Sequence, residues 1–375
     1  MKYNDKEADI AIIGAGVVGC AIARILGFLH GNKKIVVIEK RSMPGLETSL
    51  LNSNVIHSGL HEPAGSFKGK FAREGSKLII DYMLQRSLPI YKSGMIIAIP
   101  RNHLFTGLSD KLSSFIHLMR RGKEQMIDLK ILTYWGIKRY EPNIEAIGGI
   151  FIPNVWIISV GDLVYSLYSD AISKGVEFYF NSGVTGLEVR SNKYQIITSG
   201  LKINTRTVIN AAGLYADQIA AMAGFSYQLE FWRGEYYEVI GGKNKLVKRL
   251  IYPVVPAVFP SKGIHFSPRV NGRLFIGPNA RLVPLRNYYN EDITPREVFH
   301  DAVYPFCPKI KPEDLRWAYS GIRPKIKNWE SDSDFKIKLD CSDPPFLNLI
   351  GIESPGLTSS MAIAAYVEKL LKPWL

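Results

Sequence analysis

The sequence predicts an α/β (α+β) protein in which one domain has a parallel sheet covered by helices and a second domain has a mostly antiparallel sheet. Residues 8–13 and 34–39 are continuous apolar runs, which are typical of strands buried on both faces of a parallel sheet. Between them, residues 15–29 have the apolar spacing of a helix. From residue 229 to 276, short segments alternate apolar and polar residues, which indicates an antiparallel sheet with one face lining a cavity.

The rest of the chain continues this alternation of elements. We expect further helices over residues 66–85, 104–121, 161–173 and 356–371. We expect further strands over residues 93–99, 176–180, 207–213 and 346–350, with antiparallel strands over 234–239, 263–267 and 273–276.

The two domains interleave along the chain, because patterns typical of the first domain return in the middle and at the end. The sequence contains neither an internal repeat nor a low-complexity linker. The predicted dinucleotide-binding domain comprises residues 1–85, 143–227 and 318–375. The predicted second domain comprises residues 86–142 and 228–317.

Composition narrows the class of protein. The chain has 375 residues, of which 46% are hydrophobic and 22% charged, so it can bury a large core. It contains no uncharged apolar run of about 18 residues and no apolar signal-peptide core, so we expect neither a membrane span nor secretion. Cys20, Cys307 and Cys341 are too widely spaced for a disulfide framework or a metal motif, which favours a cytoplasmic protein without a metal site.

The net charge of +13 admits more than one partner. The basic residues are scattered and no nucleic-acid-binding motif is present, so nucleic acid is not expected. A basic cavity that attracts an anionic substrate is one alternative. Docking on an anionic membrane face is another, for which the basic residues within 243–249 and 368–375 are candidates.

A glycine motif joins the first predicted strand to the first helix. Gly14, Gly16 and Gly19 form a G-x-G-x-x-G run, and Glu39 ends the second strand 20 residues past Gly19. In a βαβ unit, these glycines allow a tight turn, close approach to a pyrophosphate and close helix packing, while the acid binds a ribose diol. The motif therefore predicts a Rossmann-like dinucleotide site.

Three further segments resemble the D-amino-acid-oxidase-like superfamily of flavoproteins. They are Asn210-Ala-Ala-Gly213, the run Glu47–Gly59 and the run Ile352–Ser360. In that superfamily such segments contact FAD, and the last places a helix N-terminus at the flavin pyrimidine ring, where it stabilises negative charge. The motif and the resemblance together imply FAD as cofactor. The implied cofactor-binding residues are Gly14, Gly16, Gly19, Glu39, Lys40, Thr48, Ser49, Asn52, Ala212, Gly213, Gly356, Leu357 and Thr358.

Nearly the whole chain is similar to two branches of this superfamily. Runs that resemble L-2-hydroxyglutarate dehydrogenases are Asn54–Gly59, Pro63–Lys68, Arg233–Tyr236, Ile251–Pro253, Gly263–Arg269 and Gly277–Ala280. The run Ser320-Gly-Ile-Arg-Pro324 also resembles FAD-dependent glycerol-3-phosphate dehydrogenases. Asn54 replaces the glycine usual in the first branch, His61 and Glu62 replace its tyrosines, and Gly356 replaces a lysine of the second branch.

These departures and the basic composition favour sn-glycerol 3-phosphate as substrate, oxidised to dihydroxyacetone phosphate with electrons passed to a quinone. L-2-hydroxyglutarate, oxidised to 2-oxoglutarate, remains the alternative. An amine or amino-acid oxidase that uses oxygen, and a non-catalytic flavin- or RNA-binding module, are further alternatives. A quinone-linked enzyme would contact the membrane peripherally, directly or through an anchor protein.

Histidines are the candidate bases for removing the hydroxyl proton, because their usual pKa is closest to neutrality. His265 and His57 each follow a β-branched apolar residue in a run that the resemblance places at the flavin. His265 is the first candidate. His57 is equally well suited to positioning the flavin loop, and His61 is a third candidate that could contact the substrate.

Arg323 is the first candidate for binding the substrate anion, because a guanidinium binds a carboxylate or phosphate through two parallel hydrogen bonds. Arg269 and Arg233 are supporting candidates, and a structural ion pair is an equally good interpretation of each. Tyr252 is a candidate pocket residue, for which aromatic core packing is the common alternative.

Overall fold

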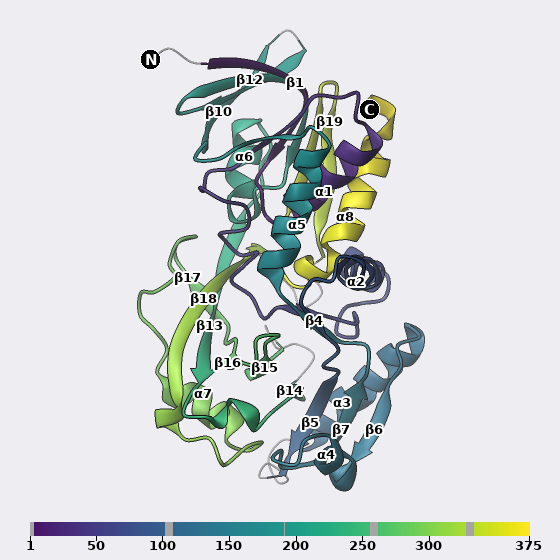
Figure 1. Cartoon of the computed structure of the whole chain (residues 1–375), viewed down its shortest axis with the longest axis vertical. Coiled ribbons are helices and arrows are strands. Elements are labelled where there is room, and N and C mark those ends of the chain that lie inside the picture. Colours follow the sequence, from purple (N-terminus) through teal and green to yellow (C-terminus); the bar gives the residue numbers. More distant parts are fainter. Residues whose placement is uncertain (1–3, 102–107, 191, 256–261, 328–333) are drawn as a thin grey trace.

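Two large sheets, stacked along the long axis of the molecule, organise the chain (Figure 1). The computed structural model describes residues 4–101, 108–190, 192–255, 262–327 and 334–375. An eight-stranded sheet lies at the end that carries both termini, and a nine-stranded sheet forms the other end. The predicted fold class is confirmed.

The eight-stranded sheet is parallel from β20 through β12, β1 and β2 to β9, and its antiparallel pairs involve β11 and β19. The order is β10-β11-β12-β1-β2-β9, and β20 pairs with both β12 and β19. Strands β1, β2, β9, β12 and β20 run parallel, so their carboxyl ends meet at one edge, which faces the second sheet. The strands are β1 (Asn4–Ile13), β2 (Ile35–Ile38), β9 (Glu177–Tyr179), β10 (Val184–Arg190), β11 (Lys193–Thr198), β12 (Leu201–Asn210), β19 (Lys336–Ser342) and β20 (Pro345–Ile350).

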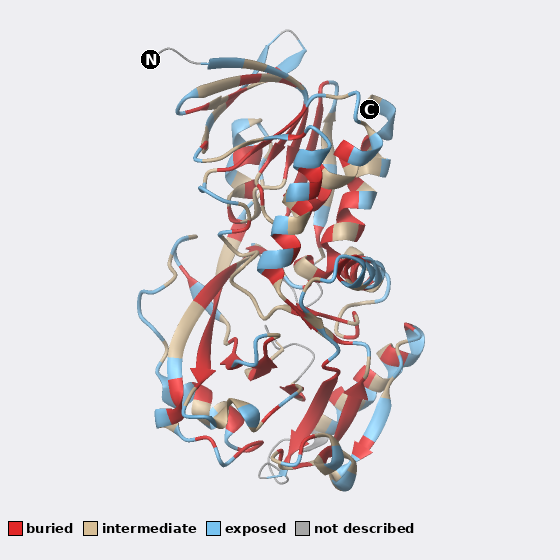
Figure 2. Ribbon diagram, viewed as in Figure 1, coloured by how far each residue is buried: buried red, intermediate tan, exposed pale blue. Residues whose placement is uncertain are grey.

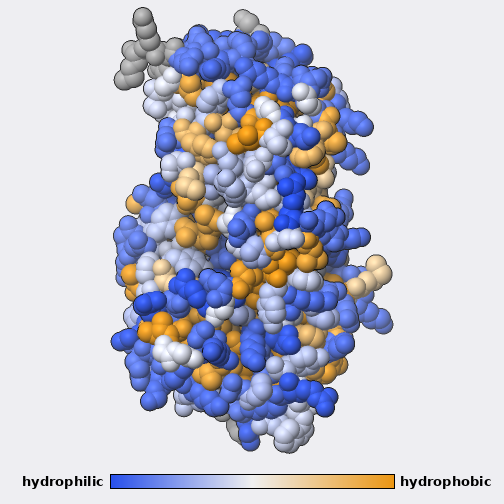
Figure 3. All heavy atoms as spheres, viewed as in Figure 1, coloured by the Kyte–Doolittle hydropathy of each residue, from blue (hydrophilic) through white to orange (hydrophobic). Residues whose placement is uncertain are grey.

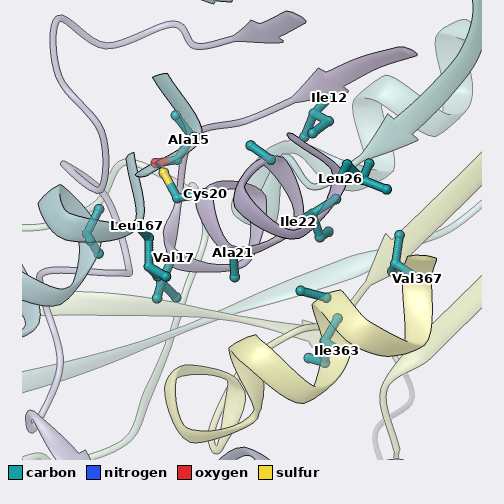
Figure 4. Close-up of a cluster of buried hydrophobic side chains, with 14 of the residues drawn as sticks. Ile12, Ala15, Val17, Cys20, Ala21, Ile22, Leu26, Leu167, Ile363 and Val367 are labelled. Carbon is teal, nitrogen blue, oxygen red and sulfur yellow. Dashed lines mark hydrogen bonds between the residues drawn. The ribbon is translucent and has the colours of Figure 1, made fainter. Parts of the chain in front are cut away.

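Helices cover both faces of this sheet. Alternate residues of β1 point to opposite faces: Ile10 and Ile12 pack against the helices α1, α5 and α8, while Ala11 and Ile13 pack towards α6. Figure 4 shows the first of these clusters, where α1 and α8 face each other through Ile22 and Ile363. The helices are α1 (Val17–Leu29), α2 (Phe67–Gln85), which packs on α8, α5 (Val160–Ser173), α6 (Ala216–Met222) and α8 (Gly356–Leu371).

The nine-stranded sheet is antiparallel except where β14 pairs with β5. Its order is β17-β13-β16-β15-β14-β5-β7-β6, and β18 pairs with β13 along its length. The strands are β5 (Met95–Pro100), β6 (Lys130–Thr133), β7 (Ala146–Ile152), β13 (Leu229–Val239), β14 (Leu250–Pro253), β15 (His265–Pro268), β16 (Leu274–Gly277), β17 (Arg281–Val283) and β18 (Leu315–Ile326).

Smaller elements complete the second sheet and join it to the first. Helices α3 (Leu108–Glu124), α4 (Tyr134–Tyr140) and α7 (Arg296–Val303) lie at this end of the molecule. A three-stranded sheet of β3 (Val55–Ile56), β8 (Trp156–Ile158) and β4 (Ile90–Tyr91) lies between the two large sheets. Its strand β3 contacts α8, so the chain between the sheets is itself part of the packed structure.

Burial follows the sheets, whose central strands are buried while the outer faces of the helices are exposed (Figure 2). One face of the molecule is mainly hydrophilic, with smaller hydrophobic patches spread over it (Figure 3). Within the described ranges, no helix combines the length and the apolar character that a membrane crossing requires.

The predicted elements match the observed ones closely where the pattern is strong. The helix predicted over 66–85 is α2, and Ser66 caps it by accepting a hydrogen bond from the Gly69 amide. The helix predicted over 104–121 is observed from residue 108 to 124, and residues 102–107 lie outside the described ranges. The segment from 130 to 158 contains α4, β6, β7 and β8, which the sequence pattern does not predict.

The sheets depart from the predicted domain boundaries at two places. Strand β7, within the range 143–227 assigned to the first domain, pairs with β5 and β6 of the nine-stranded sheet. Strand β18 pairs with β13 as far as Ile326, although the first domain was expected to resume at residue 318. Both departures have one physical cause: a strand belongs to the sheet of its hydrogen-bonding partners, which lie far away in sequence.

Candidate active site

A cavity of about 430 Å³ extends from the carboxyl ends of the parallel strands to the nine-stranded sheet. Its wall includes the loops after β1 and β2, the segment 47–57, the turn after β12 and the start of α8. Strands β13, β14, β15 and β18 contribute the opposite wall. Ligands of open α/β sheets bind at such carboxyl ends, so this cavity is the candidate site.

The glycine turn brings backbone amides to one end of this cavity. Gly14 has a φ of +105°, and a Cβ there would lie 2.6 Å from the Ala211 carbonyl oxygen. A Cβ on Gly19 would lie 2.0 Å from the Gly14 oxygen, so α1 packs directly on the turn. Gly14 and Gly16 line the cavity, whereas Gly19 is not among its lining residues and acts through packing. The N-terminus of α1 thereby offers the cavity amides and a positive dipole end.

Glu39 lies beside this turn at the end of β2. One carboxylate oxygen accepts a 2.7 Å hydrogen bond from the Ala15 amide, and the other accepts one of 2.8 Å from the Arg41 amide. Each carboxylate oxygen can accept a second bond, so a ribose hydroxyl still finds an acceptor. Lys40 also lines the cavity, and its ammonium lies 2.7 Å from Glu47.

The segment from 47 to 54 lines the cavity and is held by hydrogen bonds to both α1 and β18. Ser49 accepts a 2.9 Å hydrogen bond from the Val17 amide at the start of α1. Thr48 donates a 2.8 Å hydrogen bond to the Ile322 carbonyl of β18. Asn52 fixes the turn of the segment by donating a 2.6 Å bond to the Ser49 carbonyl. The segment therefore ties the nucleotide turn to the second sheet.

The start of α8 forms another part of the wall, through Gly356, Leu357 and Thr358. Thr358 is fully buried, and its hydroxyl accepts a 3.1 Å hydrogen bond from the His57 amide. Ala212 and Gly213, after β12, also line the cavity. Twelve of the thirteen residues predicted to bind the cofactor thus line the cavity, and the thirteenth, Gly19, packs against the glycine turn. An extended dinucleotide fits this arrangement of amides, helix N-termini and a ribose acceptor.

His265 on β15 places an uncommitted nitrogen at the cavity. Its Nδ1 lies 2.8 Å from the Gly263 carbonyl, so Nδ1 carries the proton and Nε2 has a free lone pair. Nε2 is buried and has no hydrogen-bond partner among the described residues. Burial, opposed by the bond to Gly263, lowers the pKa of His265 to about 3, so the ring is neutral and able to accept a proton.

The two other predicted histidines converge on the same region. Burial is the main cause that holds the pKa of His57 and of His61 well below the usual histidine value. The backbone of His57 is fixed by Thr358, which agrees with a positioning role for the loop. Tyr252 lines the cavity and stacks on His265, with ring centroids 3.7 Å apart. It therefore fixes the plane of the His265 ring.

Arg323 lies on β18 and lines the cavity. Arg323 pairs with Trp232 of β13. Gly234 lies two residues after Trp232 on β13, and a Cβ there would lie 2.8 Å from the Arg323 guanidinium. Gly234 therefore leaves the space that the guanidinium occupies. Among the described residues, no carboxylate lies within ion-pair distance of Arg323, so this cation is available for an anion.

The structure gives the two supporting arginines structural contacts instead of cavity positions. Arg233 is 0% exposed, forms an ion pair with Glu235 and donates to the carbonyls of Glu291 and Asp292. These contacts favour the structural ion pair, the alternative interpretation of Arg233, and Arg233 is not among the described residues that line the cavity.

Arg269 is likewise buried and absent from the cavity wall. Its guanidinium donates to the Ser53 and Asn52 carbonyls and to the Tyr319 hydroxyl. Arg269 therefore holds the segment that carries Asn52, and its direct contact with a substrate stays a prediction.

Charged residues of the wall outside the predicted site residues form ion pairs. Lys68 lies 2.8 Å from Glu353, and Lys262 lies 3.2 Å from Glu62. Lys325 follows Arg323 by two residues on β18 and lies 3.8 Å from Glu353. The alternation of strand residues could have identified Lys325, because residues two apart share a face. The pairing of Lys68 with Glu353 spans 285 residues and left no sequence signal.

Comparison with known proteins identifies the class of this site. The family model described as DAO, FAD dependent oxidoreductase, matches residues 9–370. A glycerol 3-phosphate dehydrogenase of Caloramator mitchellensis is 30% identical over 97% of this chain and 74% of its own length. A mitochondrial L-2-hydroxyglutarate dehydrogenase of Bos taurus is 31% identical over 98% of this chain and 89% of its own length.

Among solved structures, the L-alpha-glycerophosphate oxidase from Mycoplasma pneumoniae with FAD bound has a TM-score of 0.88 and 25% identity, over 98% of this chain and 95% of that chain. The glycine oxidase from Geobacillus kaustophilus has a TM-score of 0.83 at 19% identity, which shows a shared fold. The predicted resemblance is confirmed, and the chain belongs to the DAO family of FAD-dependent oxidoreductases, with FAD as its cofactor.

Proposed function

We propose that this chain oxidises the secondary hydroxyl of a small anion, with sn-glycerol 3-phosphate as substrate and dihydroxyacetone phosphate as product. The observation that carries the proposal is the joint placement of His265 and Arg323 at one cavity. His265 offers a buried lone pair to a hydroxyl proton. Arg323 offers a cation that has no carboxylate partner among the described residues.

Oxidation of a secondary alcohol removes a hydroxyl proton and a hydride. Bound FAD supplies the hydride acceptor. In our proposal, the Nε2 atom of His265 accepts the proton, and Tyr252 and the Gly263 carbonyl keep the ring in the required tautomer and plane. The negative charge of a bound substrate favours the imidazolium, so the pKa of His265 rises when the substrate is present.

FAD would be held by the glycine turn, the segment 47–54 and the start of α8. Gly14 and Gly16 would offer backbone amides to the pyrophosphate, and Glu39 would accept from the ribose. Gly356 and Thr358 place the N-terminus of α8 at the cavity, where its dipole favours negative charge. Measurements of FAD binding by variants of these residues test the assignments.

Two kinds of support favour glycerol 3-phosphate. Relatives named for glycerol 3-phosphate or glycerophosphate match almost the whole chain. The cavity wall also carries Arg323 and Lys325 two residues apart on β18, which suits a doubly charged phosphate. The second candidate is L-2-hydroxyglutarate, which the similarity to L-2-hydroxyglutarate dehydrogenases favours.

As electron acceptor we propose a quinone, reached at a membrane face to which the protein binds peripherally, directly or through an anchor protein. The basic segments 243–249 and 368–375 are candidates for that contact. Oxygen is the competing acceptor, because the structurally similar proteins include several named as oxidases. If the enzyme forms one hydrogen peroxide for each substrate that it oxidises, oxygen is the electron acceptor and the quinone is excluded.

Anaerobic reduction of the bound flavin tests the substrate. The purified holoenzyme is mixed in turn with glycerol 3-phosphate, L-2-hydroxyglutarate and glycine, and the visible absorbance of the flavin is followed. We expect rapid bleaching by glycerol 3-phosphate only. Bleaching by L-2-hydroxyglutarate alone would establish the second candidate, and bleaching by glycine alone would favour an amine oxidase.

A further inference from the structure

Strand β18 presents two cations on one face. Arg323 and Lys325 are two residues apart, and their register partners on β13 are Trp232 and Glu230. Residues i and i+2 of a strand point to the same side of the sheet, and both side chains line the cavity. The strand therefore directs a guanidinium and an ammonium towards the same volume.

The second cation, Lys325, is buried to an unusual degree. Its side chain is 4% exposed, and burial of an ammonium is unfavourable unless opposite charge lies near it. Its Nζ lies 3.8 Å from Glu353, whose same oxygen lies 2.8 Å from Lys68. The Glu353 carboxylate, just before α8, therefore lies near Lys68 of α2 and Lys325 of β18, and Lys68 is the closer of the two.

The wall therefore carries positive charge towards the cavity. Lys68 and Glu353 neutralise one another in a 2.8 Å pair, whereas Arg323 has no carboxylate within ion-pair distance among the described residues. The Lys325 ammonium lies 5.6 Å from the centre of the Trp232 ring, and Glu230 accepts a bond from the Trp232 indole. The anion that this wall favours is one that can contact Arg323 and Lys325 together.

We propose that Lys325 is a second anion-binding residue that, with Arg323, holds the phosphate of the substrate and selects a phosphate monoester over a dicarboxylate. The proposal rests on the proposed function and names its specificity residue. A phosphate concentrates two negative charges and three acceptor oxygens on one group, so two neighbouring cations can bind it at once. L-2-hydroxyglutarate carries its two charges on separate groups, so either carboxylate would engage the pair with a single charge.

The proposal predicts a pH window for binding. Burial is the main cause that lowers the pKa of Lys325 to about 8; Arg323 and Lys68 lower it further, while Glu353 and Glu62 oppose them. Lys325 is therefore protonated below about pH 8 and loses its charge above it. A phosphate monoester becomes a dianion above a pH of about 6. The phosphate ester should therefore bind most tightly between about pH 6 and pH 8. The affinity for a dicarboxylate should not fall near pH 6, because its carboxylates stay ionised there.

The test measures substrate dissociation constants of the holoenzyme by anaerobic stopped-flow reduction of the flavin. Lys325→Met should raise the Kd of glycerol 3-phosphate about 10- to 100-fold, the loss expected for one charged hydrogen bond, with less change in the reduction rate at saturation. Lys325→Arg should retain binding and remove the loss of affinity above pH 8, because arginine stays charged. The matched control is Lys327→Met, two residues further along, where the side chain is exposed.

A second probe separates binding from turnover. Inorganic phosphate should compete with glycerol 3-phosphate in the wild type and in Lys327→Met, and about 10-fold more weakly in Lys325→Met. L-2-hydroxyglutarate serves as the comparison ligand, and its inhibition should change less than that of phosphate. FAD content of each variant, from its absorbance spectrum, checks that the fold is retained.

The outcomes separate this inference from the function on which it rests. If glycerol 3-phosphate does not reduce the wild-type flavin, the proposed function fails. If it does, but Lys325→Met leaves its Kd and the competition by phosphate unchanged, the role of Lys325 is overturned while the function stands. If Lys325→Met does not retain FAD, the wild-type profile decides, because unchanged affinity from pH 7 to 9.5 contradicts the proposal.

Discussion

The two ends of the cavity are built by different means. At the proposed nucleotide end, most of the groups that would contact FAD belong to the backbone, at the turn of Gly14, the start of α1 and the start of α8, with the Glu39 carboxylate beside them. At the proposed substrate end, the groups that would contact a substrate are the side chains of His265 and Arg323, which lie on strands of the second sheet. Backbone contacts require particular residues, such as glycine, at a fixed spacing in the sequence. Side-chain contacts require only that strands far apart in sequence lie close together in the fold.

This difference explains which parts of the site the sequence predicts. The glycine turn lies within a few residues of chain, and its steric requirements leave a motif that can be read directly. Arg233 and Arg269 lie in runs that resemble the family as strongly as Arg323 does, yet only Arg323 reaches the cavity. Whether a strand residue faces the cavity or the loops behind it depends on register and on neighbours far away in sequence.

The largest effect is expected at the nucleotide end. Gly19→Ala should abolish FAD retention or folding, because the new Cβ would lie 2.0 Å from the Gly14 oxygen and would push α1 from the turn. Flavin content after purification and thermal unfolding measure this effect. Gly65→Ala is the control, because a Cβ there meets open space. Normal flavin content in Gly19→Ala would show that the turn tolerates displacement and would weaken the contrast between the two ends.

The next largest effect is expected at the base. His265→Asn should slow anaerobic flavin reduction about 10²- to 10⁴-fold, because it removes the proton acceptor while FAD stays bound. His30→Asn, which changes a histidine paired with Glu368 at the end of α1, is the control. An unchanged reduction rate would exclude His265 as the base, and the same measurement on His57→Asn would then test the remaining candidate.

A smaller loss is expected at the anion contact. Arg323→Met should raise KM and reduce kcat/KM about 100-fold, since two charge-assisted hydrogen bonds are lost, with FAD still bound. Arg316→Met removes an arginine from the same strand, where it contacts Glu238 away from the cavity. Kinetics of Arg323→Met that match those of Arg316→Met would show that the substrate anion binds elsewhere.

The fold follows the same rule as the site. Strands and helices with a strong local pattern, such as α2 and α8, were predicted to within a residue or two. The segment that contains β6, β7 and α4 was not, because Gly148 and Gly149 interrupt the apolar run of β7. The pairings of β7 and β18 with the second sheet were also missed, since their partners are decided by tertiary contact.

The smallest effect is expected where the two ends meet. Thr48 donates to the Ile322 carbonyl and lies in the segment that also contacts α1, so Thr48→Val removes a link between the ends. The loss of one hydrogen bond should cost about 1 kcal/mol of stability. If the segment couples the ends, FAD should dissociate a few-fold faster and reduction should slow by a similar factor. Thr185→Val, which removes an exposed hydrogen bond to the Ile197 carbonyl of β11, should change neither rate. A lower melting temperature with both rates intact would mean that the nucleotide and substrate ends work independently.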